Sequence, residues 1–167
     1  MPALPNKNKL SVGSEGKPGV ILAIEDDPED VELLRVALAE KGCSWTVVSV
    51  VFARDAIMYL GRVGKYGDES RYPRPNVIVL DLGLPGMSGL EFLLWAVYEP
   101  NIPPIMVLTN SRLEGSRELA ERLGVKGYFT KSTDLTDRGS AIETLLTLST
   151  PPNISSGQTR AQRNPEY

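Results

Sequence analysis

The chain has 167 residues, which favours one folded domain, and its 41% hydrophobic and 23% charged content is typical of a globular protein. A net charge of −3 and the lack of any Lys- or Arg-rich stripe disfavour sequence-independent nucleic-acid binding. The absence of His removes His-based acid–base catalysis and the commonest transition-metal ligand. Any reactive group is therefore a carboxylate, a Lys, a Ser or Thr hydroxyl, or the single Cys.

That cysteine, Cys43, cannot form an internal disulfide, which favours a reducing compartment. We interpret it as a small, partly buried residue because no basic group that could activate a thiol is readable nearby. The chain shows no signal peptide and no apolar run of about 20 residues. We therefore expect a cytoplasmic protein with no membrane segment.

The first half of the chain begins with a polar segment, residues 1–18, which Pro and Gly interrupt and which we interpret as a flexible arm. Residues 20–24 are all apolar, as in a strand that is buried on both faces. A helix is predicted to begin at Pro28, after Asp27 as its capping residue, and to end at Gly42. The β-branched run 46–51 predicts a second strand.

The middle of the chain continues the alternation of helix and strand. A short helix over 54–60 leads into a long polar connection, 61–75. Residues 77–80 predict a third strand, and residues 88–99 a third helix that Pro100 ends.

The last part of the chain completes an α/β pattern. The remaining elements are predicted as a strand at 105–108, a helix at 112–123, a strand at 126–130 and a helix at 135–148. The Pro-rich polar stretch 149–167 reads as a disordered tail. Five strands that alternate with five helices over 19–148 predict a doubly wound parallel sheet with helices on both faces.

Chemistry-bearing side chains follow four of the predicted strands. They are Glu25, Asp26 and Asp27 after the first strand, Asp81 after the third, Thr109 after the fourth and Lys131 after the fifth. The carboxyl ends of parallel strands meet at one edge of the sheet, where ligands bind in such folds. Clustered carboxylates repel one another unless a cation lies between them, and Mg²⁺ prefers carboxylate oxygens. A hydroxyl and an ammonium there can hold phosphoryl oxygens.

Each of these residues also has an ordinary structural interpretation. Asp27 precedes Pro28 and is better explained as a helix cap than as a metal ligand. Asp81 could simply begin a turn, Thr109 could end a β-branched strand, and Lys131 could be an exposed surface residue. Their joint occurrence at strand ends favours the functional interpretation.

Four segments resemble the receiver domain of two-component response regulators, over about residues 18–148. They are VILAIEDDPED, VIVLDLGLPGMSGLEFL, IMVLTNS and GVKGYFTKS. The second contains the pattern D-x-x-x-P-x-x-x-G, matched by Asp81, Pro85 and Gly89. The spacings from Asp81 to Thr109 (109 − 81 = 28) and to Lys131 (131 − 81 = 50) also agree.

The resemblance implies a role for each residue of the site. Asp81 would be the phosphoacceptor, with Thr109 and Lys131 beside the phosphoryl group. Mg²⁺ or Mn²⁺ would be held by Asp26 and Asp81, by the backbone carbonyl of Gly83, and by Glu25 through water. Thr109 and Tyr128 would form the switch that responds to phosphorylation. The implied fold is flavodoxin-like, with strand order 2-1-3-4-5.

The resemblance also implies partners. A sensor histidine kinase or a phosphotransfer protein would supply the phosphoryl group, and the signal would pass on by protein–protein contact. Three features are most similar to single-domain regulators that are paired with phytochrome-type and related sensor kinases. They are the long 61–75 connection, the run RPNVIVLDLGLP and the ending TKS. A homodimer could form through the face of the fourth helix, fifth strand and fifth helix.

Three positions depart from the family pattern. Ser132 stands where Pro usually follows the lysine, Asn110 is bulkier than the usual small residue, and Gly83 carries no side chain beside the phosphoacceptor. The apolar helix around Trp95 leaves two interpretations open, packing on the sheet or a partner surface.

Two rival functions remain. A phosphatase of the haloacid-dehalogenase type needs a second Asp where this chain has Gly83, and a pseudo-receiver that only docks would be expected to lack the acids or Lys131.

Overall fold

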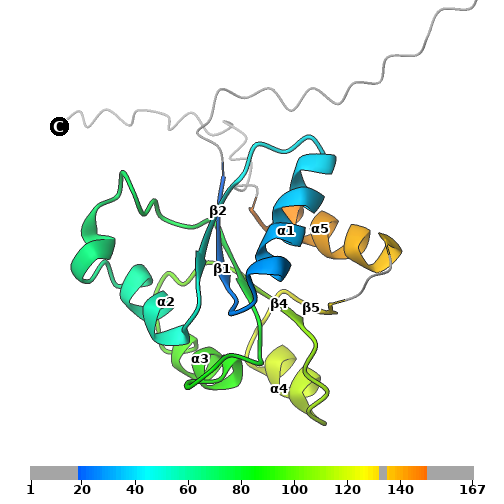
Figure 1. The fold of residues 1–167 in the computed structure, drawn as a ribbon. Helices are drawn as coiled ribbons and strands as arrows, with labels where there is room; N and C mark the ends of the chain where they lie inside the picture. Colours follow the sequence, from blue (N-terminus) through cyan, green and yellow to red (C-terminus); the bar gives the residue numbers. More distant parts are fainter. Residues whose placement is uncertain (1–18, 132–134, 150–167) are drawn as a thin grey trace, which may run out of the picture.

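The computed structural model describes residues 19–131 and 135–149. Five strands form one parallel sheet in the order β2-β1-β3-β4-β5 (Figure 1). They are β1 (Val20–Ile24), β2 (Thr46–Val50), β3 (Val77–Leu80), β4 (Ile105–Thr109) and β5 (Gly127–Thr130). This arrangement confirms the predicted flavodoxin-like topology.

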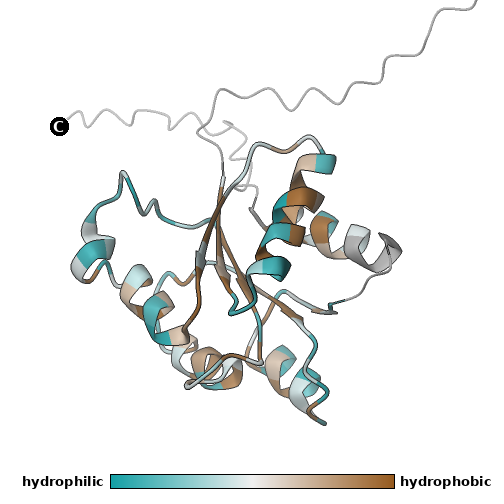
Figure 2. Ribbon diagram, in the orientation of Figure 1, coloured by the Kyte–Doolittle hydropathy of each residue, from teal (hydrophilic) through white to brown (hydrophobic). Residues whose placement is uncertain are grey.

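Helices cover both faces of the sheet. They are α1 (Pro28–Glu40), α2 (Ala53–Leu60), α3 (Gly89–Ala96), α4 (Ser116–Arg122) and α5 (Leu135–Ser149). Successive strand residues point to opposite faces, so Ile21 and Ala23 pack with α1 and α5, whereas Leu22 and Ile24 pack with α2, α3 and α4. Burial on both sides explains why the central strands are apolar along their length (Figure 2).

Two helices are shorter than the sequence pattern predicted. α4 begins at Ser116 rather than at Arg112, because Gly115 has a left-handed backbone (φ +75°) that a helix cannot include. α3 ends at Ala96, and the following N–H groups of Tyr98 and Glu99 donate to carbonyls three residues back. Those bonds form a tightened last turn, which the apolar periodicity cannot distinguish from a continuing helix.

The connection 61–75 is not simply a polar loop, as the sequence suggested. It contains a short 3₁₀ helix, η1 (Gly64–Gly67), and it buries Tyr66 against Tyr59 and Tyr72. The hydroxyl of Tyr59 donates to the carbonyl oxygen of Pro73 at 2.6 Å. Through these contacts the connection packs against α2, although it is long and polar.

The apolar helix α3 packs on the sheet and also leaves apolar side chains exposed. Phe92 is buried, and its ring lies 5.3 Å from that of the partly buried Trp95. On the outer side Leu94, Val97 and Tyr98 are exposed, Tyr98 to 85%. Packing on the sheet therefore explains Phe92 and Trp95, and the partner surface remains a prediction.

Several other predictions concern single positions or the chain ends. Cys43 is half-buried, and its thiol lies 3.6 Å from the carbonyl oxygen of Lys41. None of the helices that the structure describes is long and apolar enough to cross a membrane. The predicted arm 1–18 lies outside the described residues, as does the predicted tail from residue 150 onward. Ser132, which departs from the family pattern after Lys131, also lies outside the described residues.

Gly89 allows the chain after β3 to pass close to the start of α3. A Cβ atom at Gly89 would lie 2.4 Å from the carbonyl oxygen of Asp81 and 2.6 Å from Cα of Leu82. Both atoms belong to the backbone and cannot rotate away. The glycine of the D-x-x-x-P-x-x-x-G pattern is therefore required by close backbone contact.

We expect Gly89→Ala to lower the free energy of unfolding by about 1–3 kcal/mol, because the backbone must shift to admit the methyl group. Urea denaturation followed by circular dichroism measures this loss. Gly83→Ala is the matched control, since its Cβ would meet only the Asp81 carboxylate, no closer than 3.6 Å. An equal loss in both variants would contradict the explanation.

Candidate functional site

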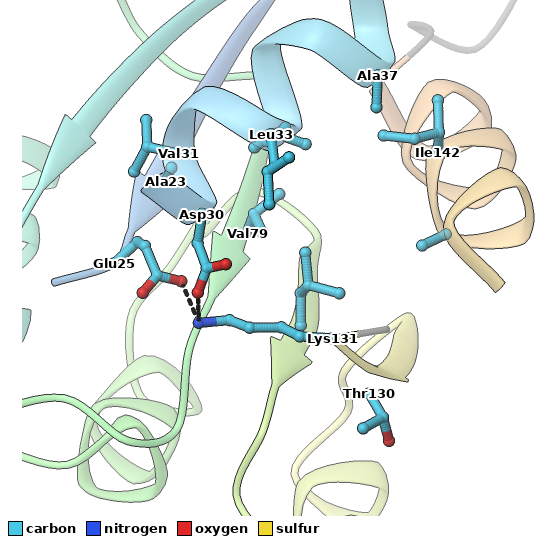
Figure 3. Close-up of a pocket in the computed structure, with 13 residues that line it drawn as sticks. Ala23, Glu25, Asp30, Val31, Leu33, Ala37, Val79, Thr130, Lys131 and Ile142 are labelled. Carbon is cyan, nitrogen blue, oxygen red and sulfur yellow. Dashed lines mark hydrogen bonds and ion pairs between the residues drawn. The ribbon is translucent and has the colours of Figure 1, made fainter. Parts of the chain in front are cut away.

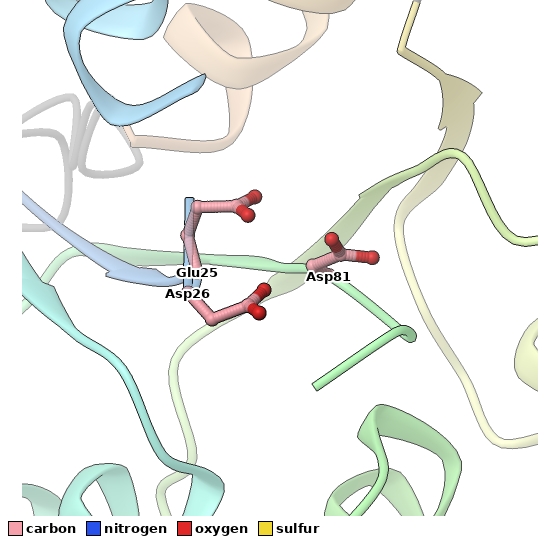
Figure 4. Close-up of side chains that lie close together, drawn as sticks. All are labelled: Glu25, Asp26 and Asp81. Atoms are coloured by element: carbon pink, nitrogen blue, oxygen red, sulfur yellow. The ribbon is translucent and has the colours of Figure 1, made fainter. Parts of the chain in front are cut away.

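Three carboxylates meet at the carboxyl edge of the sheet. Glu25 and Asp26 follow β1, and Asp81 follows β3, which pairs with β1 so that Ile24 lies opposite Leu80. One carboxylate oxygen from each acid lies within 4.8 Å of the others (Figure 4). Strand pairing thus brings together acids that are 55 or more residues apart in the sequence (81 − 26 = 55).

The carboxylate of Asp81 is buried, with only 7% of the residue exposed, and it accepts three hydrogen bonds. Its Oδ1 accepts from the hydroxyl of Thr109 at 2.5 Å and from the N–H of Gly83 at 2.9 Å, and its Oδ2 accepts from Lys131 at 2.7 Å. Burial raises the pKa of Asp81, but the bonds from Gly83, Lys131 and Thr109 outweigh burial and lower the pKa below its usual value. The hydrogen bonds therefore hold the Asp81 carboxylate in place and favour its charged form.

Lys131 follows β5, and its ammonium group bridges three acids, of which Figure 3 shows Glu25 and Asp30. Its Nζ lies 2.7 Å from oxygens of Glu25, Asp30 and Asp81. Burial alone would lower the pKa of Lys131, but the hydrogen bonds to Asp30, Asp81 and Glu25 raise it above the usual value. The ammonium therefore stays charged and offsets part of the repulsion among the acids.

Glu25 and Asp26 differ in their surroundings. Glu25 is buried, and this burial raises its pKa even though Lys131 and the N–H of Asp27 favour the charged form. Asp26 is exposed to solvent. Asp26 thus leaves the acidic cluster open on one side, so that an ion can approach the buried Asp81.

Asp27 serves as the predicted helix cap. Its side chain accepts from the N–H of Glu29 at 2.8 Å, and Pro28 occupies the first helical position. Its carboxylate is not among the clustered acids. The structural interpretation of Asp27 is therefore confirmed.

Thr109 is fully buried and its hydroxyl is held from several sides. Besides donating to Asp81, its Oγ1 accepts from the N–H of Ser111 at 3.1 Å and from the N–H of Leu82 at 3.4 Å. These contacts fix the hydroxyl hydrogen toward Asp81. Thr109 is therefore part of the site rather than only the last residue of a strand.

Tyr128, in β5, is half-buried and contacts the start of α4. Its hydroxyl lies 3.0 Å from Oγ of Ser116, and the guanidinium of Arg117 lies 4.4 Å from the centre of its ring. Arg117 also donates to the carbonyl oxygen of Tyr128 at 3.1 Å. The aromatic ring thus links β5 to α4.

Sequence reasoning missed Asp30 and Ser116. Asp30 is the third residue of α1, and an acid there is commonly explained by the helix dipole. Its place on the first turn, directly above the carboxyl ends of the strands, was the available signal. Nothing in the sequence indicated that Ser116 would meet the hydroxyl of Tyr128, because that contact depends on where α4 begins.

The donor set suits a hard divalent cation. Mg²⁺ binds oxygens at about 2.1 Å, so opposite ligands lie about 4.2 Å apart. The three acids offer oxygens that lie within 4.8 Å of one another, a spread close to that separation. The residues present therefore fit such an ion.

A five-stranded 2-1-3-4-5 sheet with clustered acids and a lysine at its carboxyl edge defines the receiver class. The model of the family described as "Response regulator receiver domain" matches residues 21–143. The chain therefore belongs to the response regulator receiver domain family.

The chain is also similar, in sequence and in structure, to individual response regulators. It is 33% identical over 122 residues to the response regulator Rcp1 of Synechocystis, covering 72% of this chain and 81% of Rcp1. Solved structures of the Mn²⁺-bound form of Rcp1 and of the phosphorylated cyanobacterial phytochrome response regulator RcpA superpose with TM-scores of 0.66 and 0.68, each at 31% identity. Each match covers 78% of this chain, with 93% of the Rcp1 chain and 96% of the RcpA chain. The bacteriophytochrome response regulator RtBRR is 34% identical, with a TM-score of 0.65 and coverage of 77% of this chain and 78% of that chain.

We expect Lys131→Met to lower the free energy of unfolding by up to about 3 kcal/mol in the presence of a chelator, because buried acids then lose their counter-charge. Added Mg²⁺ should recover part of this loss, since the ion restores positive charge. Urea denaturation in EDTA and in Mg²⁺ measures both effects.

Lys41→Met is the control for this prediction. Lys41 forms an exposed ion pair with Glu143 at 3.3 Å, and such pairs contribute less than about 1 kcal/mol. A Lys131 variant that is as stable as the Lys41 variant would contradict the role of the ammonium.

Proposed function

We infer that this protein is a phosphorylation switch that accepts a phosphoryl group on Asp81 with Mg²⁺ or Mn²⁺ bound beside it. The observation that carries this proposal is the environment of Asp81. A buried anionic carboxylate lies in contact with a lysine and a hydroxyl, and next to acids that fit a cation. The phosphorylated RcpA and the Mn²⁺-bound Rcp1 support it by family relation.

The chain's own residues would contribute positioning and charge. An oxygen of Asp81 attacks phosphorus, the bond to the donor's leaving group breaks, and that group departs with the bonding electrons. Lys131 and the hydroxyl of Thr109, which contact Asp81 before the reaction, would then bind the phosphoryl oxygens. Asp26, Asp81 and the carbonyl of Gly83, with Glu25 through water, would hold the cation. When bound, the cation would neutralise phosphoryl charge.

The switch would run from Thr109 to Tyr128. Movement of the Thr109 hydroxyl toward the phosphoryl group would change the space beside β4, and the ring of Tyr128 would respond. Because this ring contacts Ser116 and Arg117, its movement would be transmitted to α4. The output is then a change in the surface formed by α4, β5 and α5.

We propose protein partners rather than a small-molecule substrate. The phosphoryl donor would be a sensor histidine kinase, and similarity to RcpA and RtBRR favours one of the phytochrome type. The α4, β5 and α5 face would also serve in a homodimer, and the exposed Leu113 and Leu119 lie on or beside α4. Reaction occurs on the protein itself, so we do not class it as a turnover enzyme.

Incubation with acetyl phosphate and Mg²⁺ tests the proposal. We expect the intact mass to increase by one phosphoryl group, and Asp81→Asn to show no increase. Chelation of the metal should abolish the adduct in the natural chain. An absence of adduct would favour a pseudo-receiver, and repeated hydrolysis of a phosphate ester would favour a phosphatase.

Gly83 should shorten the life of the phosphorylated form. The residue is exposed, and a Cβ there would lie 3.6 Å from Oδ1 of Asp81, so its absence leaves that side of the carboxylate open to water. We expect Gly83→Asn to lengthen the phosphoryl lifetime, measured by phosphate release after removal of the donor. An unchanged lifetime would refute this role, and Gly83→Ala tests whether bulk alone suffices.

A further inference from the structure

Asp30 contacts the site without belonging to the clustered acids. It lies on α1, whereas Glu25, Asp26 and Asp81 follow strands, and its oxygens are not among those within 4.8 Å of one another. Yet its Oδ2 accepts a hydrogen bond from Lys131 at 2.7 Å, as short as the contact from Lys131 to Asp81. A residue placed only to complement a helix dipole would not need this contact.

The ammonium of Lys131 has three N–H groups, and the structure gives each a carboxylate. The three acceptors are Glu25, Asp30 and Asp81, all at 2.7 Å, and the lysine side chain is 11% exposed. A lysine side chain has a flexible four-carbon stem, so its ammonium can occupy many positions. The three hydrogen bonds together fix the position of this ammonium. Each acceptor therefore removes part of the rotational freedom of the ammonium.

Under the proposed function, on which this inference rests, only one of these three hydrogen bonds takes no part in the phosphorylation chemistry. The N–H that now bonds Asp81 would bind the phosphoryl oxygens instead, and Glu25 would share its charge with the cation. Asp30 has neither task, so its bond to Lys131 can persist through the reaction.

We propose that Asp30 is a positioning residue that holds the ammonium of Lys131 over Asp81 while the phosphoryl group is transferred. The bond from Asp30 keeps one N–H of Lys131 occupied and leaves the N–H next to Asp81 directed at the incoming phosphoryl oxygens. Positioning of this kind lowers the barrier because the charged group needs no reorientation during the reaction.

Asp30→Ala and Asp30→Asn test this role, with Glu29→Ala as the matched control. Glu29 is an exposed acid in the same helical turn, so both alanine variants remove one negative charge at almost the same place. The rate of phosphorylation by acetyl phosphate at saturating Mg²⁺ should fall by roughly tenfold in Asp30→Ala, by less in Asp30→Asn, and not in Glu29→Ala. Asp30→Glu should recover part of the rate.

Two further measurements separate positioning from a general effect of charge or folding. The dissociation constant for Mg²⁺ is measured for each variant, so that the phosphorylation rates are compared with every site saturated; a rate difference that persists at saturation does not come from weaker metal binding. In the unphosphorylated protein, the ¹⁵N signal of the Lys131 ammonium should broaden through hydrogen exchange in Asp30→Ala and stay sharp in Glu29→Ala.

The outcomes distinguish this inference from the proposed function. If the natural chain gains no phosphoryl group, the proposed function fails and this inference fails with it. If the natural chain is phosphorylated but Asp30→Ala and Glu29→Ala react at the same rate, only the positioning role is overturned. A slower Asp30→Ala with an unaltered Lys131 signal would likewise exclude positioning.

Discussion

The structure of the site depends on one ammonium group placed among carboxylates. Four acids lie at the carboxyl edge of the sheet, and three of them, Glu25, Asp30 and Asp81, are bonded to Lys131. Like charges at this separation repel, and burial removes the water that would screen them. The lysine offsets part of that repulsion, and the negative charge that remains suits a divalent cation.

The parallel sheet makes this concentration of charge possible. Every strand ends at the same edge, so residues that are far apart in the sequence project into one volume. The apolar strands and the two helical layers pack together and bury the backbone beneath that edge. The core thus supplies the stability that allows charged groups to be gathered at its rim.

Contacts behind the site couple it to the rest of the fold. Thr109 is bonded to Asp81 on one side and to the N–H groups of Leu82 and Ser111 on the other, so a shift of its hydroxyl alters the loops after β3 and β4. Tyr128 joins β5 to α4 through Ser116. The proposed switch from Asp81 to α4 would use these two sets of contacts, on the neighbouring strands β4 and β5.

The sequence by itself determined the fold class and most of the site, because both depend on local patterns. Apolar runs followed by acids, a hydroxyl or a lysine place Asp26, Asp81, Thr109 and Lys131 at strand ends. Only the tertiary structure decided which partners these groups meet. The bond from Asp30 to Lys131, the true start of α4 and the burial of Tyr66 arise from packing between distant segments, and the periodicity of one segment does not encode the position of another.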